Sequence, residues 1–344
     1  MNAPAHGGVG MGERNVGAGP APSITVVIPT FRRPDLLARC LEAVAGQSLA
    51  PPYYEVMVCD DGCDPDTERL VRRFEAMHAG RGPRFTYIAV TATQGPAGAR
   101  NRGWREARTE FIAFTDDDTI PHPHWLAEGL QALRLDVGAV AGRIEVPLPP
   151  RPTDYELDCA GLARAEFATA NCFVRRAVLE RVRGFDEHYT AAWREDSDLQ
   201  FAILCAGYRI GRAERAVVVH PVRPARWGVS IAQQRKSQFD ALLYKKYRGL
   251  YANRIATPRP WRYYAIVLCL LGAVAAALGQ WFGVALACLA VWAGLSLGFA
   301  LRRLHGTATS AAHRAEMLWT SLCIPPLSVF WRLYGAVRFR VAFF

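Results

Sequence analysis

The chain has 344 residues, of which 51% are hydrophobic and 21% charged, and its formal net charge is +10. These proportions are those of ordinary globular proteins, so they exclude wholesale disorder, and the length allows about two structural units. The nine cysteines contain no CxxC pair and are odd in number. This pattern argues against a disulfide framework or a zinc knuckle and indicates a reducing, cytosolic setting for the soluble part.

Residues 1–22 are rich in Gly, Ala and Pro and lack a continuous apolar stretch, so we predict a flexible tail rather than a signal peptide. From residue 23 to 222, short β-branched runs alternate with segments of helical spacing. The predicted strands lie at 24–28, 56–58, 85–90 and 111–114, and the predicted helices at 34–44, 67–77 and 97–107. This alternation predicts an α/β fold with a mostly parallel sheet that is covered on both faces.

Acidic residues cluster directly after two of the predicted strands. Asp60 and Asp61 follow the second strand, and Asp116, Asp117 and Asp118 follow the fourth. Such sheets bind ligands at the carboxyl ends of their strands. Adjacent carboxylates repel one another, and a divalent cation such as Mg²⁺ or Mn²⁺, held together with substrate phosphates, removes that cost. The other interpretation of residues 116–118 is a solvated turn that caps the next helix.

Six short motifs occur in a fixed order: VIPTFRR at 27–33, DDG at 60–62, GPAGARNRG at 95–103, FTDDD at 114–118, GFDE at 184–187 and REDSDL at 194–199. In these motifs the chain resembles family 2 glycosyltransferases with the GT-A fold. The resemblance extends from about residue 24 to residue 220, which is over half of the chain. It implies a GT-A catalytic domain at 23–222 that binds a nucleotide sugar.

The resemblance also implies roles for single residues. Those implied to bind the nucleotide sugar are Thr30, Arg32, Asp60, Asp61, Arg100, Asp116 and Asp117. The metal ligands that it implies are Asp116, Asp118 and His220, with Asp118 as the more direct ligand of the two acids. Each assignment has a plain alternative, because an arginine at a helix start is often exposed and a lone histidine before a proline is often structural.

The chemistry implied is an inverting displacement at the anomeric carbon of a sugar, with a nucleoside diphosphate as leaving group. Asp196 is the candidate base that takes the proton of the acceptor hydroxyl, and Glu195 is the neighbour that shapes its field. The alternative for this acid pair is a favourable position at the positive end of a helix. We place Asn171 and Trp193 on the acceptor side, although Trp193 fits a protein core equally well. The QxxRW signature of processive members is absent, which favours transfer of one residue.

The C-terminal third has the pattern of a membrane protein. Residues 223–262 contain ten basic side chains and one acid, and residues 263–301 contain no charge at all. We predict a basic juxtamembrane segment at 223–262 and a hairpin of two membrane helices at 263–301, with a break at Gly279 and Gln280. A shorter apolar stretch is interrupted by Pro325 and Pro326, so 317–340 is predicted to be interfacial or re-entrant. A buried helical subdomain and a nucleic-acid-binding patch are the alternatives.

Basic residues flank the hairpin on both sides, which predicts a multi-pass protein of the cell membrane with its catalytic domain in the cytosol. The leading hypothesis is therefore a membrane-anchored, metal-dependent glycosyltransferase that moves one sugar to a hydroxyl of a lipid-linked or membrane-proximal acceptor. A polyprenyl-phosphate sugar synthase is the alternative enzyme, and its ionised acceptor needs no base. A membrane scaffold without turnover is the alternative from another class, and the grouped carboxylates argue against it.

Overall fold

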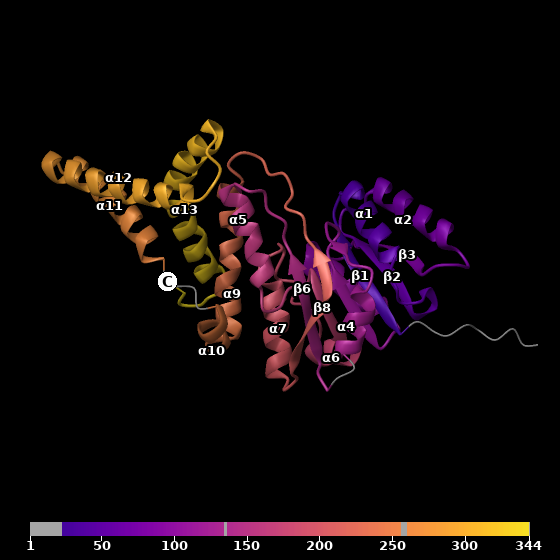
Figure 1. Cartoon of the computed structure of the whole chain (residues 1–344). Helices are drawn as coiled ribbons and strands as arrows, with labels where there is room; N and C mark the ends of the chain where they lie inside the picture. Colours follow the sequence, from indigo (N-terminus) through magenta and orange to yellow (C-terminus); the bar gives the residue numbers. More distant parts are fainter. Residues whose placement is uncertain (1–22, 134–135, 256–259, 344) are drawn as a thin grey trace, which may run out of the picture.

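A computed structural model of the chain describes residues 23–133, 136–255 and 260–343, so the predicted tail at 1–22 lies outside the described residues. The centre of the molecule is an eight-stranded sheet with the order β3-β2-β1-β4-β7-β6-β8-β5 (Figure 1). Its strands are β1 (Ile24–Thr30), β2 (Tyr54–Asp60), β3 (Arg84–Ala89), β4 (Phe111–Thr115), β5 (Ile120–Pro121), β6 (Ala139–Glu145), β7 (Asn171–Arg175) and β8 (Ile210–Val219).

Helices cover both faces of this sheet and continue beyond it into a separate C-terminal group. Those of the sheet domain are α1 (Pro34–Ala45), α2 (Pro65–His78), α3 (Pro96–Glu106), α4 (Trp125–Leu133), α5 (Asp154–Ala160), α6 (Arg176–Val182) and α7 (Glu195–Cys205). Those that follow are α8 (Val229–Gln233), α9 (Gln238–Lys246), α10 (Arg248–Leu250), α11 (Trp261–Leu278), α12 (Phe282–Leu304) and α13 (Ala311–Arg338).

The sheet is mixed and mostly parallel. The first four strands pair in parallel, and β6 pairs with β8 in parallel. Antiparallel pairing joins β7 to β4 and β6, and β5 to β8. The four predicted strands are present as β1 to β4, and the α/β prediction is confirmed. Strand β7 was not predicted, because its antiparallel position depends on partners far away in the chain.

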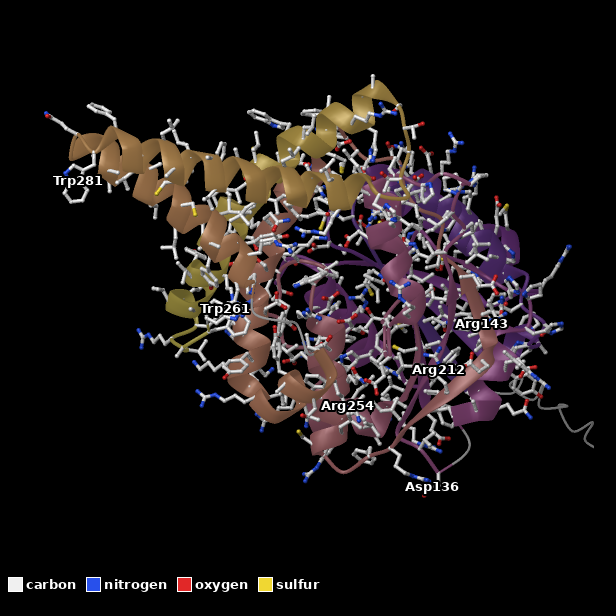
Figure 2. All side chains as sticks on the ribbon, turned by 60° about the vertical axis from the view of Figure 1, so that its left-hand side comes forward. Asp136, Arg143, Arg212, Arg254, Trp261 and Trp281 are labelled. Carbon is white, nitrogen blue, oxygen red and sulfur yellow. The ribbon has the colours of Figure 1, made fainter. Side chains whose placement is uncertain are left out.

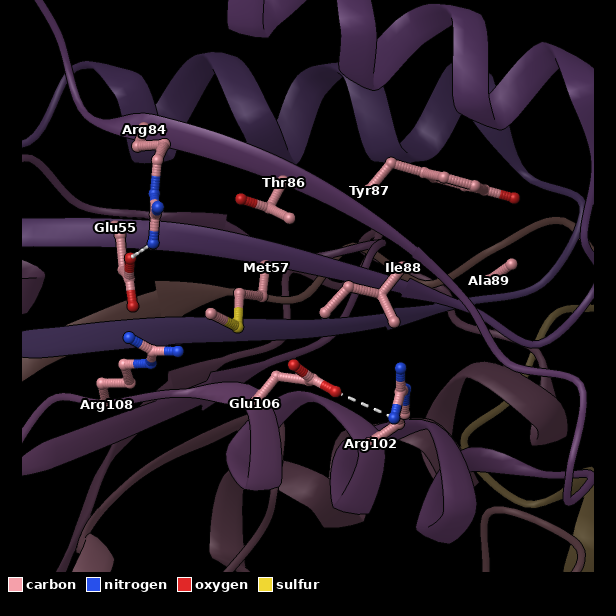
Figure 3. A pocket seen from close by; sticks show the side chains of 10 residues that line it. All are labelled: Glu55, Met57, Arg84, Thr86, Tyr87, Ile88, Ala89, Arg102, Glu106 and Arg108. Carbon is pink, nitrogen blue, oxygen red and sulfur yellow. Dashed lines mark hydrogen bonds and ion pairs between the residues drawn. The ribbon is translucent and has the colours of Figure 1, made fainter.

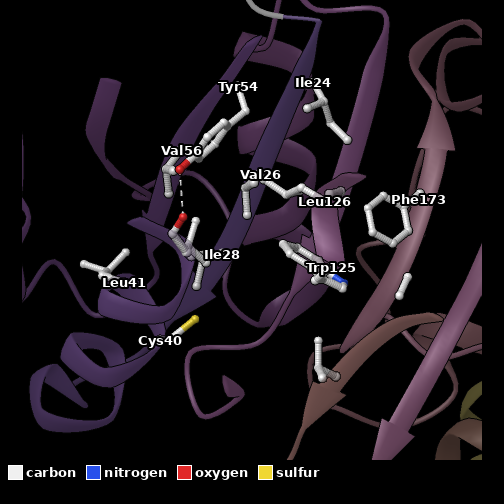
Figure 4. Close-up of a cluster of buried hydrophobic side chains, with 14 of the residues drawn as sticks. Ile24, Val26, Ile28, Cys40, Leu41, Tyr54, Val56, Trp125, Leu126 and Phe173 are labelled. Carbon is white, nitrogen blue, oxygen red and sulfur yellow. Dashed lines mark hydrogen bonds between the residues drawn. The ribbon is translucent and has the colours of Figure 1, made fainter. Parts of the chain in front are cut away.

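Alternation along β1 explains why the sheet is buried on both faces. Val26 and Ile28 belong to one core cluster with side chains of α1, α2 and α4, whereas Val27 belongs to a second cluster with side chains of α3, α6 and α7. Trp125 and Phe173 are fully buried in the first cluster, with ring centroids 5.2 Å apart (Figure 4). A rigid three-layer core therefore holds the ends of the strands in place.

Helix α3 starts directly beside the carboxyl ends of the strands. Pro96 occupies its first turn, and Gly95 before it has φ +104°, a conformation that other residues rarely adopt. Gly103 lets the helix lie close to the sheet, because a Cβ there would be 2.8 Å from Sγ of Cys59. This close packing fixes the position of Arg100, one turn before Gly103.

Helices α11 and α12 form an antiparallel hairpin that projects away from the sheet (Figure 1). They meet at Gly279 and at Gln280, which has φ +61°, where the sequence predicted the break. Trp281 lies at the tip of the hairpin and Trp261 near its base (Figure 2). Both helices are long and apolar enough to cross a membrane, and only 17% of each apolar window is buried inside the molecule.

The two prolines of the third apolar segment do not break the helix that contains them. That 317–340 is interfacial or re-entrant stays a prediction. Helix α13 runs for 28 residues with Pro325 and Pro326 inside it. A proline has no backbone N–H and so removes one hydrogen bond from a helix, but here contacts with α9, α11 and α12 hold α13 in place. Arg338 near its end donates to Oε1 of Gln238 at 2.6 Å. Helix α13 is not among the candidate membrane spans of the described residues.

Several charges of the predicted juxtamembrane segment face the catalytic part of the chain. Lys246 lies 2.6 Å from Oδ1 of Asp198, and Arg254 pairs with Glu166. Arg223, which was assigned to the same segment, pairs with Asp118. The number of basic residues in the sequence therefore overstates the positive charge that this segment presents to a membrane surface. Some of these residues instead pair with acids of the catalytic part of the chain.

Candidate active site

The acids after β4 and the histidine after β8 meet at one end of the sheet. Strand β5 pairs with the end of β8, with Ile120 opposite Val219, and so brings the two strand ends together. Ligand atoms of Asp116, Asp118 and His220 all lie within 4.8 Å of one another. Nε2 of His220 is 3.4 Å from Oδ1 of Asp118. Two carboxylates and an imidazole are a suitable donor set for a small divalent cation.

Each of the three consecutive acids also has an arginine. Arg100 donates through Nη2 to Oδ1 of Asp116 at 2.7 Å. Nη2 of Arg33 lies 3.1 Å from Oδ1 of Asp117.

The third pair joins the acid loop to the segment after β8. Nε of Arg223 lies 2.9 Å from Oδ2 of Asp118. We did not assign Arg33 or Arg223 to the site from the sequence. Arg33 was visible only as the last residue of the first motif, and Arg223 only as one of ten basic residues before the hairpin.

The pKa values of Asp116 and Asp117 shift in opposite directions although the residues are neighbours. Burial raises the pKa of Asp116, but the nearby Arg100, His220 and Arg33 together outweigh it, so the net shift is downward. Burial raises the pKa of Asp117 to about 6. The Thr30 hydroxyl donates to Oδ2 of Asp117 at 2.7 Å, and both residues are buried. Thr30 and Asp117 therefore support the loop from within.

Arg100 connects the acid cluster to the start of α7. Its Nη1 donates to Oε1 of Glu195 at 3.3 Å, so the predicted base region lies beside the predicted metal ligands. Burial, with the nearby charge of Asp196, raises the pKa of Glu195 to about 7. Oε2 of Glu195 is buried and has no hydrogen-bond partner among the described residues.

Asp196 has one carboxylate oxygen fixed by its neighbour. Oδ1 accepts from the backbone N–H of Ser197 at 2.6 Å and from its hydroxyl at 3.2 Å. Burial raises the pKa of Asp196. An acid with a raised pKa and a fixed orientation at a strand-end site has the features of a general base. Asp198, two residues on, instead accepts from Tyr189 at 3.1 Å and pairs with Lys246.

The two acids after β2 have different surroundings. Asp60 is fully buried and accepts hydrogen bonds from the backbone of Gly62 at 2.8 Å and of Asp64 at 2.7 Å. Its carboxylate therefore shapes the turn. Oδ2 of Asp61 accepts from the backbone of Gly95 at 2.7 Å, but Oδ1 is buried with no partner in the described part of the chain. Of the pair, Asp61 is the one with an acceptor atom left for a ligand.

Two arginine–aromatic contacts lie at the surface of this region. Arg32 has φ +52°, and its guanidinium lies 5.2 Å from the ring of the exposed Phe31. Trp193 is 39% exposed, with the guanidinium of Arg194 4.7 Å from its ring. Trp193 is thus not a core residue, and Arg194 is itself held by Asp240 through a 2.6 Å bond. These side chains are accessible to a ligand.

Asn171 does not lie on an accessible surface. It is buried in β7, accepts from Nε1 of Trp125 at 2.8 Å and donates to the carbonyls of Arg143 and Ala216, each at 2.8 Å. The sequence prediction treated this stretch as the acceptor side, but the antiparallel pairing of β7 places it inside the sheet. We therefore remove Asn171 from the candidate site, because its amide serves to tie three segments together.

A cavity of about 560 Å³ lies elsewhere, over the free edge of the sheet at β3 (Figure 3). Among its charged residues, Arg84 pairs with Glu55, and Arg102 lies 2.9 Å from Glu106. None of the predicted site residues lines it. We therefore place the candidate active site at the acids of the strand ends, because the residues that line this cavity include no comparable group of metal ligands.

Comparisons with known proteins identify the family of the chain. The family model described as "Glycosyl transferase family 2" matches residues 25–192, and "Glycosyl transferase family group 2" matches residues 153–334, more than half of the chain. The chain is 28% identical to glycosyltransferase AglE of Haloferax volcanii over 213 residues, which are 59% of this chain and 68% of AglE.

A second relative is validoxylamine A glucosyltransferase of Streptomyces hygroscopicus subsp. limoneus. The two chains are 30% identical over 226 residues, covering 54% of this chain and about half, 49%, of the relative.

A solved structure has a similar fold. It is the mannosyltransferase PcManGT from Pyrobaculum calidifontis in complex with GDP-Man and Mn²⁺, with a TM-score of 0.56 and 22% identity. The similarity covers 94% of this chain and 88% of PcManGT, which confirms the GT-A type of fold. From its motifs, its fold and these matches, the chain belongs to glycosyltransferase family 2 and is a glycosyltransferase.

Proposed function

We propose that the chain is an inverting, metal-dependent glycosyltransferase that moves one sugar from a nucleoside-diphosphate donor to a hydroxyl of a lipid-linked or membrane-proximal acceptor. The observation that carries the proposal is the joining of two acid groups by Arg100. This arginine contacts Asp116 of the metal-ligand cluster and Glu195 next to the candidate base. The donor phosphates and the acceptor hydroxyl therefore meet over one buried guanidinium.

The donor binds across the carboxyl ends of β1, β2 and β4. Asp61 receives a hydrogen bond from the base or ribose on its unpartnered Oδ1. Arg32 and Phe31 form the exposed edge of the nucleotide site, where the ring and guanidinium offer a stacking surface. Thr30, Asp60 and Asp117 support these residues from below through their internal hydrogen bonds.

Asp116, Asp118 and His220 hold the divalent cation, and Mn²⁺ or Mg²⁺ fits their oxygen-rich donor set. When bound, such a cation neutralises charge that develops on the leaving diphosphate. Asp196 takes the proton of the acceptor hydroxyl. Trp193 packs against the acceptor, since its exposed ring lies two residues before Glu195.

The acceptor is placed near a membrane by the C-terminal helices. Large apolar side chains such as Leu268, Leu271 and Leu286 on α11 and α12 are 59–70% exposed, an arrangement that water does not tolerate over a whole hairpin. We propose that α11 and α12 span the cell membrane and that the basic residues on both flanks keep the catalytic domain on the cytosolic side. Helix α13 lies at the interface with its exposed apolar face toward lipid.

The test uses the full chain purified in detergent. Nucleotide sugars with different bases are screened for Mn²⁺- or Mg²⁺-dependent release of the nucleoside diphosphate. With an active donor, the anomeric configuration of the product is read by NMR. We expect metal-dependent release, abolished by chelation, and inversion at the anomeric carbon. Retention of configuration, or turnover that chelators do not change, contradicts the proposal.

The polyprenyl-phosphate sugar synthase remains the competing function, and Asp196 separates the two. A hydroxyl acceptor needs a base, so Asp196→Asn should lower transfer by about 10²–10⁴-fold with unchanged donor affinity. The matched measurement supplies the same variant with polyprenyl phosphate as acceptor. Rapid sugar transfer to that phosphate by the variant favours the synthase instead.

A further inference from the structure

The three consecutive acids of the site are already neutralised in the ligand-free chain. Arg100, Arg33 and Arg223 come from three separate segments and pair with Asp116, Asp117 and Asp118 in turn. Arg100 also contacts Glu195, so three arginines serve four acids in this group. Each of the three consecutive acids thus has a positive partner without a cation, which differs from what their spacing suggests.

A divalent cation that entered this site alone would meet unfavourable electrostatics. The side chain of Asp118 is only 4% exposed and already has Arg223 and Arg33 beside it, so two further positive charges would be added at a poorly hydrated position. A diphosphate adds negative charge of similar size and restores the balance. The cation and the diphosphate therefore stabilise one another in the site, which is a positive coupling of their binding.

The arginines differ in their freedom to respond to this change of charge. Arg100 is 3% exposed and is shared between two acids. Arg33 is 33% exposed and is held mainly by the buried Asp117 at 3.1 Å, with a longer contact of 3.9 Å to Asp118. The side chain of Arg223 is 44% exposed, and its segment between β8 and α8 has no helix or strand. Arg223 lies three residues after His220 in the sequence, and its partner Asp118 is itself a candidate metal ligand. It is the arginine that a cation on Asp118 displaces most easily.

We propose that Arg223 is a diphosphate-binding residue that pairs with Asp118 until the cation arrives, and then transfers its contact to the donor diphosphate. A guanidinium suits this exchange, because it makes charge-assisted hydrogen bonds to carboxylate and phosphate oxygens alike. No covalent bond changes in the exchange. The inference rests on the proposed function and adds to it that the cation and the donor bind as one coupled ligand.

The experiment measures two affinities on the full chain in detergent. Mn²⁺ binding without nucleotide is followed by the electron paramagnetic resonance of free Mn²⁺. Binding of UDP and of GDP at saturating Mn²⁺ is followed by calorimetry. In Arg223→Gln we expect Mn²⁺ alone to bind about 3–10-fold more tightly, because its competitor has gone. We expect the nucleotide to bind about 10–100-fold more weakly, because a charged hydrogen bond is lost.

Arg226→Gln is the matched control, since Arg226 is exposed in the same segment and has no ion pair among the described residues. It should change neither affinity. Arg223→Lys keeps the charge and should give values between those of the native chain and Arg223→Gln. It also keeps the test valid if the glutamine variant fails to fold.

The opposite signs of the two effects are the signature of the exchange. If Arg223→Gln weakens both Mn²⁺ and nucleotide, Arg223 merely maintains the structure, and the inference is overturned. It is also overturned if neither affinity changes. If the native chain binds no nucleoside diphosphate with any cation, the proposed function fails and the inference falls with it, a result that is distinct from the other two.

Discussion

The strand-end site contains clustered acids, and the C-terminal hairpin contains exposed apolar side chains. Each arrangement is unfavourable in water unless something compensates it, and the compensation differs between the two regions. In the site, acids such as the half-buried Asp116 and the buried Asp118 receive arginines from distant segments. In the hairpin, side chains such as Leu271 and Leu278 remain mostly exposed. Charges are thus compensated within the chain, whereas the apolar surface requires an environment that the chain does not contain.

Removing a ligand from the site gives the largest expected effect. Asp118→Ala should lower transfer by about 10³-fold or more, because it removes a proposed cation ligand and leaves Arg223 without its acid. Asp136→Ala is the control, since the side chain of Asp136 is exposed and its ion pair in the described part of the chain is a surface pair with Arg209. Transfer rates and thermal unfolding are measured together. Native turnover in Asp118→Ala contradicts the assignment of the metal site.

A charge in the hairpin tests the other side of the comparison. Leu271→Arg places a charge near the middle of α11 and should disfavour insertion by about 2.5–3.5 kcal/mol. Leu322→Arg makes the same change on the exposed face of α13, where an interfacial helix tolerates it. The fraction of protein that resists carbonate extraction from membranes is compared. Equal losses for the two variants would place α11 and α13 in the same environment.

The two regions are joined by Arg303 of α12, which connects the hairpin to the sheet domain. Its Nη2 donates to Oδ2 of Asp154 in α5 at 2.7 Å, and its Nη1 donates to Thr320 of α13 at 2.6 Å. Arg303→Met should destabilise the protein by about 2–4 kcal/mol, because it leaves Asp154 without its partner. Arg302→Met changes the exposed neighbour and should be near neutral. Thermal unfolding in detergent compares the two variants.

The smallest effect concerns Glu195 and pH. Its pKa is about 7 in the folded chain, above the ordinary glutamate value, because of burial and the charge of Asp196. The folded state therefore binds this proton more tightly than the unfolded state. Protonated Glu195 contributes fully to the free energy of unfolding at low pH, and this contribution is lost as pH rises through about 7.

Glu195→Gln removes this titration. The unfolding free energy of the variant should therefore fall by about 1–2 kcal/mol less than that of the native chain between pH 5 and pH 8. The measurement is the difference in unfolding free energy between variant and native chain at each pH. A difference that stays constant across this range shows that Glu195 does not ionise there.

The sequence by itself determined the family, the first four strands, the acids at their ends and the uncharged hairpin. These follow from local patterns: β-branched runs, motif spacing and unbroken hydrophobicity are properties of neighbouring residues. Asp61, Asp116, Asp118 and His220 were accessible to sequence reasoning for the same reason, since each lies within three residues of the end of a strand.

Only the tertiary structure decided how these residues are used. Asn171 became internal because β7 runs antiparallel between β4 and β6, and Asp60 was occupied by its own turn. The prolines of α13 stayed helical because other helices hold it. Arg223 moved from the predicted membrane surface to the site because strand pairing carried its segment to Asp118. Such decisions depend on contacts between distant segments, whose energies exceed local preference and leave no trace in local sequence.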